Sequence, residues 1–347
     1  MARSNREGWI HVGSFMLAGL LLWLALRGVE WTTLKATFLH ADYRWLIPVV
    51  IVTLVSHWLR AIRWSWFLDV TPGMTADHPA PVSRMNTFVS VMVGYMANYA
   101  GPRLGEVIRT VNVAKKEDRS FSTVLGTVVV ERVVDMLTFA LCLLTLPLVF
   151  ADQIGPLWSL LTAPVTEWAS STSPLLLTGL VIGVILASAV GLWFLIRGLR
   201  GSSRIASIAQ QFRVGLLSVT RTGRTGSVIA ITMAIWVCYG FMAWIPFLML
   251  GQAGVFGIGA LDAWGLMLIG AVGVILPSPG GIGTYHFITI QALAMLFSMP
   301  QTEAASYALL THSGQMLLYV LVGFAGMLFL GATFDVSSTR DESHADS

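Results

Sequence analysis

The sequence predicts an all-α, polytopic helical membrane protein with about six full spans, two Pro/Gly-broken re-entrant hairpins and an inverted repeat. Of its 347 residues, 55% are hydrophobic and 11% are charged, with a mean hydropathy of +0.74. Soluble domains carry about 25% charged residues. The apolar runs are long and continuous, as in spanning helices and unlike the alternating strands of a β-barrel. We expect one integral membrane domain over residues 1–332 and a polar cytoplasmic tail over 333–347.

Six long apolar runs predict the full spans. Each is long enough to cross a hydrocarbon core of about 30 Å at about 1.5 Å per residue. The first run follows Arg3 and Arg6, is longer than a typical signal-peptide core and lacks an obvious cleavage site, so we expect a retained span. The spans are expected at residues 8–26, 44–66, 121–150, 174–196, 227–249 and 304–331.

Two shorter apolar stretches end at Pro/Gly breaks and then turn apolar again. Phe88–Ala100 runs into GPRLGE at 101–106, and Ala263–Leu276 runs into PSPGGIG at 277–283. Each stretch covers roughly 20 Å as a helix, which is too short for a full span. A broken backbone at membrane depth must be buried in protein or line a cavity, and a pair of such segments is a sequence indication of a transporter's substrate site. We expect re-entrant hairpins near residues 85–114 and 263–298.

Lys and Arg in short loops predict the orientation. The segments 101–120 and 197–224 are rich in Lys and Arg, whereas 151–173 and 250–262 contain neither. The basic segments and both termini are therefore expected in the cytoplasm, with the chain in the cell membrane (inner or plasma). In this orientation the two hairpins re-enter from opposite sides, which is the arrangement of an inverted repeat. The repeat halves are expected at residues 8–150 and 174–331.

A basic amphipathic segment lies between the predicted fourth and fifth spans. Residues 203–219 place Ile205, Ile208 and Phe212 on one helical face, while Arg204 and Arg213 lie off that face. This pattern suits an interfacial helix bound to anionic lipid. A solvated basic linker is the alternative interpretation.

The first break is surrounded by ionisable residues. Glu106 is three residues from both Arg103 and Arg109, so a helix after the break would put the three side chains on one face. Guanidinium groups bind phosphate through two parallel hydrogen bonds, and a helix N-terminus attracts anions. We expect a lipid phosphate to bind here. The alternative is an internal salt-bridge network that holds the hairpin in place.

Other charged residues fall within or at the end of predicted spans. Glu131 and Asp135 are four residues apart and share a helical face, and Arg132 can reach Asp135. Charges at this depth are usually functional or paired. They are predicted to balance the arginines or to couple protons, with purely structural pairing as the alternative. Arg60 and Arg63 end the second span and are expected to snorkel to the cytoplasmic interface, with lipid headgroup contact as the alternative.

The second break has almost no side-chain charge. We expect it to act through backbone groups and close helix approach, for which glycine is required. His286 and His312 lie nearby, and ordinary polar packing is expected because no third metal ligand is suitably spaced. The predicted residues of this hairpin are Pro277, Pro279, Gly280, Gly281 and Gly283.

The sequence contains no motif of a familiar enzyme active site. Phosphate-binding loops, hydrolytic elbows and zinc-binding patterns are not found. Cys142 and Cys238 lie inside apolar runs and are expected to be buried free thiols. We therefore expect no catalytic residue, no cofactor, no metal and no nucleic-acid partner.

Three stretches, in this order and at this spacing, resemble the lysylphosphatidylglycerol synthase transmembrane-region (flippase-like) family. They are NYAGPRLGEVIR at 98–109, VVERVVD at 129–135 and LPSPGGIG at 276–283, and the resemblance covers most of residues 10–332. In bifunctional members of the family, this type of domain is associated with moving aminoacylated phosphatidylglycerol between leaflets. A separate cytosolic domain transfers the lysyl group from charged tRNA. We expect no such transferase domain in this sequence, so the resemblance implies translocation.

The sequence therefore favours a lipid flippase or translocase for an anionic or aminoacylated phospholipid or a lipid-linked substrate. Arg103 and Arg109 would hold the headgroup, and Glu106, Glu131 and Asp135 would balance or gate it. The alternatives are a membrane-embedded lipid or glycosyl transferase, resembling phosphatidylglycerol lysyltransferase, or a non-transporting partner of a separate synthase. A transferase requires a donor site, and no donor-binding motif is visible. Expected partners are the phospholipid substrate, anionic lipid at residues 203–219, and a separate synthase or a second copy of the chain.

Overall fold

The computed structural model describes residues 2–71, 81–101, 104–152, 155, 222–275 and 278–331. The predicted span at 174–196, the segment 203–219 and the tail 333–347 lie outside the described residues. The described residues form helices and contain no strand. Their helices are α1 Ala2–Leu26, α2 Trp31–Leu39, η1 Tyr43–Trp45, α3 Leu46–Asp69, α4 Arg84–Ala97, α5 Leu104–Lys116, α6 Phe121–Leu143, α7 Leu146–Val149, α11 Thr225–Met249, α12 Gln252–Val255, α13 Ala260–Ile275, η2 Pro279–Gly281, α14 Thr284–Phe297 and α15 Gln301–Leu330.

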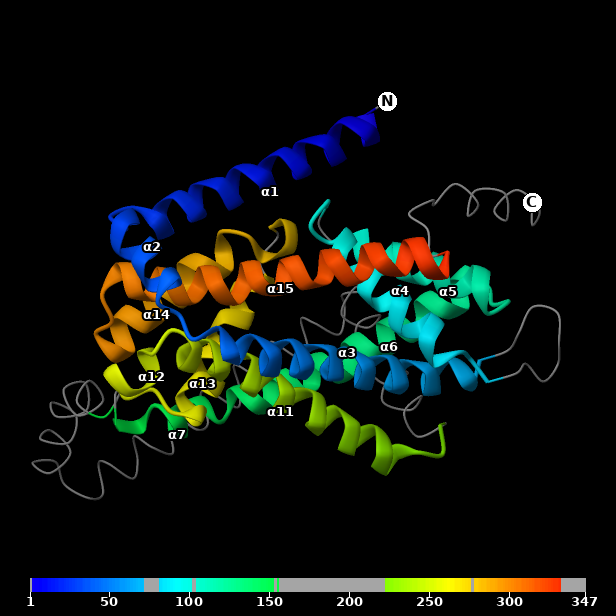
Figure 1. Ribbon diagram of the computed structural model, residues 1–347. Helices are drawn as coiled ribbons and strands as arrows, with labels where there is room; N and C mark the ends of the chain where they lie inside the picture. The colour runs from blue at the N-terminus through cyan, green and yellow to red at the C-terminus, as the bar shows by residue number, and fades with distance from the viewer. Residues whose placement is uncertain are drawn as a thin grey trace, which may run out of the picture.

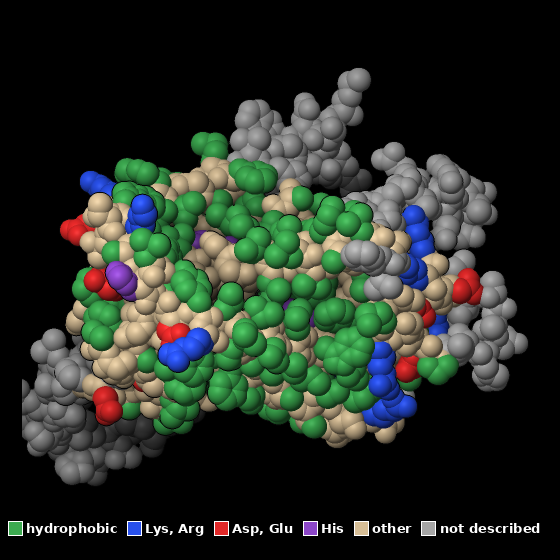
Figure 2. Space-filling view, in the orientation of Figure 1, with side chains coloured by type: hydrophobic (Ala, Val, Ile, Leu, Met, Phe, Trp, Pro, Cys, Tyr) green, Lys and Arg blue, Asp and Glu red, His purple; other side chains and the backbone are tan. Residues whose placement is uncertain are grey.

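The helices confirm a polytopic helical membrane protein. Within the described ranges, five helices are long and apolar enough to cross a membrane, or six if one bent pair counts as a single span. The long helices α3, α6, α11 and α15 run along the length of the molecule (Figure 1). On the face in Figure 2, hydrophobic side chains cover the middle and charged side chains lie mainly toward the two ends. This distribution suits a bundle whose apolar sides face acyl chains.

The first predicted span, 8–26, lies within α1, and the chain bends sharply directly after it. The chain bends by 85° between Gly13–Leu26 and Trp31–Leu39, so α1 and α2 pass the length and hydropathy test only as a broken pair. Gly28 lies in this bend with a positive φ of 87°. The described part of α1 packs mainly on α14 and η2. In Figure 1 its N-terminal part extends away from the bundle.

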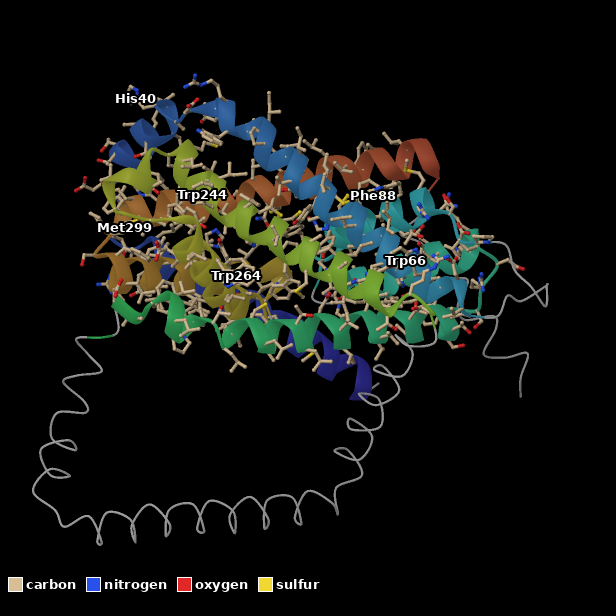
Figure 3. All side chains as sticks on the ribbon, turned by 90° about the horizontal axis from the view of Figure 1, so that it is seen from below. His40, Trp66, Phe88, Trp244, Trp264 and Met299 are labelled. Atoms are coloured by element: carbon tan, nitrogen blue, oxygen red, sulfur yellow. The ribbon has the colours of Figure 1, made fainter. Side chains whose placement is uncertain are left out.

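Both predicted breaks divide pairs of helices, and Pro279–Phe297, at the second break, is one of the five segments long and apolar enough to cross a membrane. The first break separates α4 from α5, and the second, which contains η2, separates α13 from α14. The two helices of each pair pack against each other. Figure 1 shows α4 and α5 toward one end of the bundle and α13 and α14 toward the other. Figure 3 agrees, since Phe88 on α4 lies toward one end and Met299, just after α14, lies toward the other.

Glycine allows the two helices of the first hairpin to touch. A Cβ atom on Gly105 would collide with the carbonyl oxygen of Gly94, and a Cβ on Gly94 would lie 2.9 Å from the carbonyl oxygen of Gly105. The Gly105 N–H donates to the Asn98 side chain at 2.8 Å. At the other end of the hairpin, Glu117 accepts hydrogen bonds from the Ser83 backbone and the Asn86 side chain at 3.1 and 2.6 Å. The hairpin is therefore fastened at both its tip and its base.

The tips of the two hairpins meet inside the bundle. A Cβ atom on Gly280, in the second break, would overlap the ring of Tyr99, which precedes the first break. The Tyr99 ring also lies 6.3 Å, centroid to centroid, from His312 on α15. Since α15 packs against both α4 and α14, it supports the two tips where they touch.

Candidate functional site

A network of buried charges joins α3, α5 and α6. It includes both carboxylates predicted in the third span, and these face other helices through ion pairs. Moving such groups out of water costs several kcal/mol per ion unless partners compensate. The members of this network, called the charge network below, are Arg60 and Arg63 on α3, Arg109 on α5, and Glu131 and Asp135 on α6.

Glu131 is the centre of the charge network. Its side chain is 0% exposed. One carboxylate oxygen accepts from Arg60 Nη1 at 2.9 Å, and the other accepts from Arg109 Nη1 at 2.9 Å. Arg63 Nη2 lies 3.8 Å from the first oxygen. Glu131 thus joins the first hairpin to α3, and the prediction that it lies inside the protein is correct.

Asp135 pairs with the two arginines of α3. It accepts from Arg60 Nη2 at 2.8 Å and from Arg63 Nη2 at 2.6 Å. The remaining donors of these arginines reach α11, where Arg60 contacts the Tyr239 hydroxyl and Arg63 contacts the Thr232 hydroxyl, each at 3.0 Å. Asp135 therefore fastens α6 to α3, and the two arginines extend the network to α11.

The predicted snorkelling of Arg60 and Arg63 is wrong. Their side chains are 4% and 0% exposed. The physical reason is the matching spacing of the two helices. Arginines three residues apart on α3 face carboxylates four residues apart on α6, so each charge finds a partner without reaching the interface.

The predicted pairing of Arg132 with Asp135 is also wrong. Arg132 Nη2 donates to Glu106 on α5 at 3.0 Å. Its position directly after Glu131 turns it away from α3, because successive residues on a helix differ by about 100° in direction. The predicted grouping of Glu106 with Arg109 holds only in part, because they share a helix but pair with different residues of α6. Arg103 lies outside the described residues.

Beside the charge network is a small hollow between the first hairpin and α6. Among its lining residues are Tyr95, Asn98, Glu106, Arg109 and Arg132. Several buried polar atoms of these side chains have no hydrogen-bond partner among the described residues: Nε and Nη2 of Arg109, Nε of Arg132 and Oε2 of Glu106. Arg109 also lies over the Trp64 ring, 4.8 Å from its centroid, which supports the cation from one side. We call this hollow the arginine hollow.

The charge network and arginine hollow together carry an excess of positive charge in the described part of the chain. Four guanidinium groups (Arg60, Arg63, Arg109 and Arg132) meet three carboxylates (Glu106, Glu131 and Asp135). Buried charges are normally paired. An anion in the arginine hollow would supply the missing negative charge and the missing acceptor for Arg109.

Four of the five residues predicted for the second break are described, and Pro277 lies outside the described residues. Pro279 is buried, and Gly280, Gly281 and Gly283 have φ of 57°, 79° and 81°. A Cβ atom on Gly283 would also collide with the backbone of α1 at Ala18.

Two histidines hold the backbone of the second break. His312 Nε2 lies 2.9 Å from the Gly280 carbonyl oxygen, and the Gly283 N–H donates to His286 Nδ1 at 3.4 Å. These rings make polar contacts, as expected, and both hydrogen bonds are to backbone groups of the turn.

Over the described ranges, no group of three or more His, Cys, Asp or Glu side chains could hold a metal ion. Cys142 and Cys238 are free thiols of intermediate burial, so the expectation of full burial is wrong.

Comparison with known proteins identifies one family. The model described as lysylphosphatidylglycerol synthase TM region matches residues 11–323, a range that contains the charge network, the arginine hollow and both hairpins. No curated protein and no solved structure matches the chain.

Proposed function

The chain belongs to the lysylphosphatidylglycerol synthase transmembrane-region family, and on that premise we propose that it moves a lipid between membrane leaflets. Family membership supports a membrane lipid-related function. The finer proposal is an anionic or aminoacylated phospholipid, or a lipid-linked substrate with the same phosphate chemistry. We place the chain in the cell membrane with both termini in the cytoplasm, as its loop charges favour.

One observation carries the proposal: Arg109 is buried, yet two of its nitrogens have no acceptor in the part of the chain that the structure describes. Its third donor atom, Nη1, is held by Glu131, so the guanidinium is fixed while one edge stays available. A phosphate oxygen accepts such hydrogen bonds with good geometry. The guanidinium groups of the charge network and the arginine hollow outnumber the carboxylates, so a bound phosphate would neutralise the remaining positive charge.

Glu106 and Arg132 would act as the movable side of the site. They are the least buried ion pair of the charge network and the arginine hollow, with side chains 26% and 39% exposed. A phosphate entering the arginine hollow would compete with Glu106 for Arg132, since the two bind the same donor. The released carboxylate could then accept from an amine on the headgroup. Arg103, which lies outside the described residues, is the other arginine that the sequence predicts for the headgroup.

The hairpins would provide the path. We propose that they re-enter the membrane from opposite sides and belong to the inverted halves 8–150 and 174–331. Their positions toward opposite ends of the bundle and the contact between Tyr99 and Gly280 support this proposal. In such folds, transport is a rocking of one half against the other around a central site. The touching tips would then close the central path in the conformation described here.

The test is lipid movement in proteoliposomes that contain a fluorescent anionic phospholipid, compared with a neutral one. We expect Arg109→Gln to abolish movement of the anionic lipid. The matched control is Arg63→Gln, because Arg63 is equally buried but has both terminal nitrogens bonded to protein. The control should lose stability while the properly folded fraction keeps its transport per molecule.

Equal transport per folded molecule by wild type and Arg109→Gln would refute the role of the arginine hollow. Mass spectrometry of the same vesicles separates the alternatives. A new lipid product would support a transferase, and lipid movement that appears only after a synthase is added would support a partner role.

A further inference from the structure

We propose that His286 and His312 form a proton-binding site that controls the contact between the two hairpin tips. The link from this site to transport rests on the proposed function, whereas the link from proton binding to tip opening does not. The ligand is the proton, and the responding element is the second break, residues 278–283.

The two rings are buried at the point where four segments meet. His286, in the first turn of α14, is 3% exposed, and His312 on α15 is 9% exposed. Their ring centroids are 4.8 Å apart. The Tyr285 ring stacks on His312 at 5.3 Å, and Tyr99 from the first tip approaches the same ring edge-on. The pair therefore lies between the second break and the first.

The hydrogen bonds define which nitrogen carries the hydrogen on each ring. The Gly283 N–H can only donate, so His286 Nδ1 is the acceptor and its hydrogen is on Nε2. The Gly280 carbonyl can only accept, so His312 Nε2 carries the hydrogen. The His286 ring is then neutral in this conformation. His286 Nε2 has no partner among the described residues, although it is buried.

Protonation of His286 breaks this arrangement. A proton on Nδ1 removes the acceptor of the Gly283 N–H and sets two N–H groups against each other. Gly283 precedes α14, so the lost bond frees the turn between η2 and α14. The positive φ of Gly283 and its close fit to Ala18 on α1 mean that a shift of this residue also moves the contact with α1.

The surroundings offer the new charge no counter-ion in the described part of the chain. The titratable groups around the pair are Tyr99 at the first tip, Tyr285 on α14 and Tyr307 on α15. Among their described residues, α1 and α13 bring backbone and small side chains to this point, at Ala18 and Gly273. An uncompensated imidazolium is disfavoured in a dry site. Proton uptake therefore favours a separated, hydrated tip, and the neutral His286 ring favours the closed contact.

A third buried histidine lacks this connection. His57 on α3 lies between Tyr95 and Tyr319 with ring centroids 4.6 and 5.0 Å away, and neither of its nitrogens is bonded to a described residue. Within the described ranges it therefore caps no backbone group. It therefore serves as the control for a buried histidine outside the tips.

The experiment is hydrogen–deuterium exchange of the peptide covering residues 278–286 in the purified full chain at pH 5 to 8. Dividing each exchange rate by the intrinsic chemical exchange rate at that pH gives the equilibrium constant for opening of the tip. A single linked proton predicts that opening increases up to about tenfold per unit fall in pH. His286→Asn keeps an acceptor where Nδ1 lies but does not titrate, so its opening should be independent of pH. His57→Asn should retain the wild-type dependence.

His312→Gln is the second variant, because a glutamine amide can still donate to Gly280 while the neighbouring titratable ring is lost. It should reduce the pH dependence even if His286→Asn does not fold. Opening that is independent of pH in the wild type would overturn the proposal, as would a dependence that survives in His286→Asn or disappears in His57→Asn. Vesicles that move no lipid at any pH, while the tip still opens with acid, would refute the proposed function and leave the proton site standing.

Discussion

Replacing Glu131 by Gln should destabilise the protein more than any other neutral substitution in the charge network. The substitution keeps the size of the side chain and removes its charge. Glu131 is 0% exposed, and it is the only carboxylate paired with Arg109 among the described residues. The variant would leave the Arg109 guanidinium buried opposite a neutral amide.

The expected loss of unfolding free energy depends on which arginines still have a carboxylate partner in each variant. Removing one partner of a buried ion pair costs about 3–5 kcal/mol of unfolding free energy, because the other charge stays buried. Asp135→Asn is the matched control. In that variant Arg60 keeps Glu131 at 2.9 Å, and Arg63 keeps the same carboxylate at 3.8 Å together with the Thr232 hydroxyl at 3.0 Å. Asp135→Asn should therefore lose only hydrogen bonds to a charged group, which lowers the unfolding free energy by about 1.5–3 kcal/mol.

The assay is reversible unfolding of both variants in mixed detergent and SDS micelles, at one protein concentration and one pH. A double variant with Arg109→Gln tests the pairing directly. Its loss should be smaller than the sum of the two single losses, because removing both partners leaves no orphaned charge. A loss below about 1 kcal/mol for Glu131→Gln, or a larger loss for Asp135→Asn, would show that the network is hydrated or paired differently.

Three further predictions follow from the hairpins and their supports. Gly105→Ala should lower the unfolding free energy by about 1–3 kcal/mol, because the new Cβ forces α4 and α5 apart. The control is Gly126→Ala on α6, where a Cβ meets open space and stability should change little. The same micelle titration compares the two variants. Trp64→Phe should cost about 1 kcal/mol, because the indole N–H loses its 2.9 Å hydrogen bond to α6, and an unchanged unfolding midpoint would contradict this. With both native cysteines replaced by alanine, a cysteine at exposed Lys115 should react with an impermeant maleimide only from the cytoplasm and one at exposed Leu261 only from outside. Labelling of both from one side would refute opposite re-entry.

The positions of the helices could be predicted because local sequence determines them. The expected spans at 227–249 and 304–331 correspond to α11 at Thr225–Met249 and α15 at Gln301–Leu330. Hydrophobic runs of this length have few alternatives in a membrane. The breaks could also be predicted, because clustered proline and glycine residues interrupt helices. The bend after α1 was missed because a single Gly28 within a short polar connection gives a weak signal.

The partners in the charge network could not be predicted in the same way. Arg60 is separated from Glu131 by 71 positions and from Asp135 by 75. Arginines at the end of a span usually snorkel, so the local pattern indicated the wrong environment. One signal was present nonetheless. Two carboxylates in mid-span require counter-charges, and a pair of arginines on a neighbouring helix at a matching spacing was available to provide them.

The two hairpins are held in place by different interactions, ion pairs at the first and backbone hydrogen bonds at the second. The first hairpin is fastened to α6 by ion pairs, and through Glu131 it is linked to Arg60 on α3, so its separation would expose several buried charges at once. The second break is held by histidine hydrogen bonds and a tight turn, whose rearrangement exposes no permanent charge. The barrier to movement is therefore lower on the second side. If the halves rock, the second tip should leave the contact with Tyr99 first, while the buried Arg109–Glu131 pair stays in place. A gate that moves without disturbing the binding site would let the same arginines face either leaflet in turn.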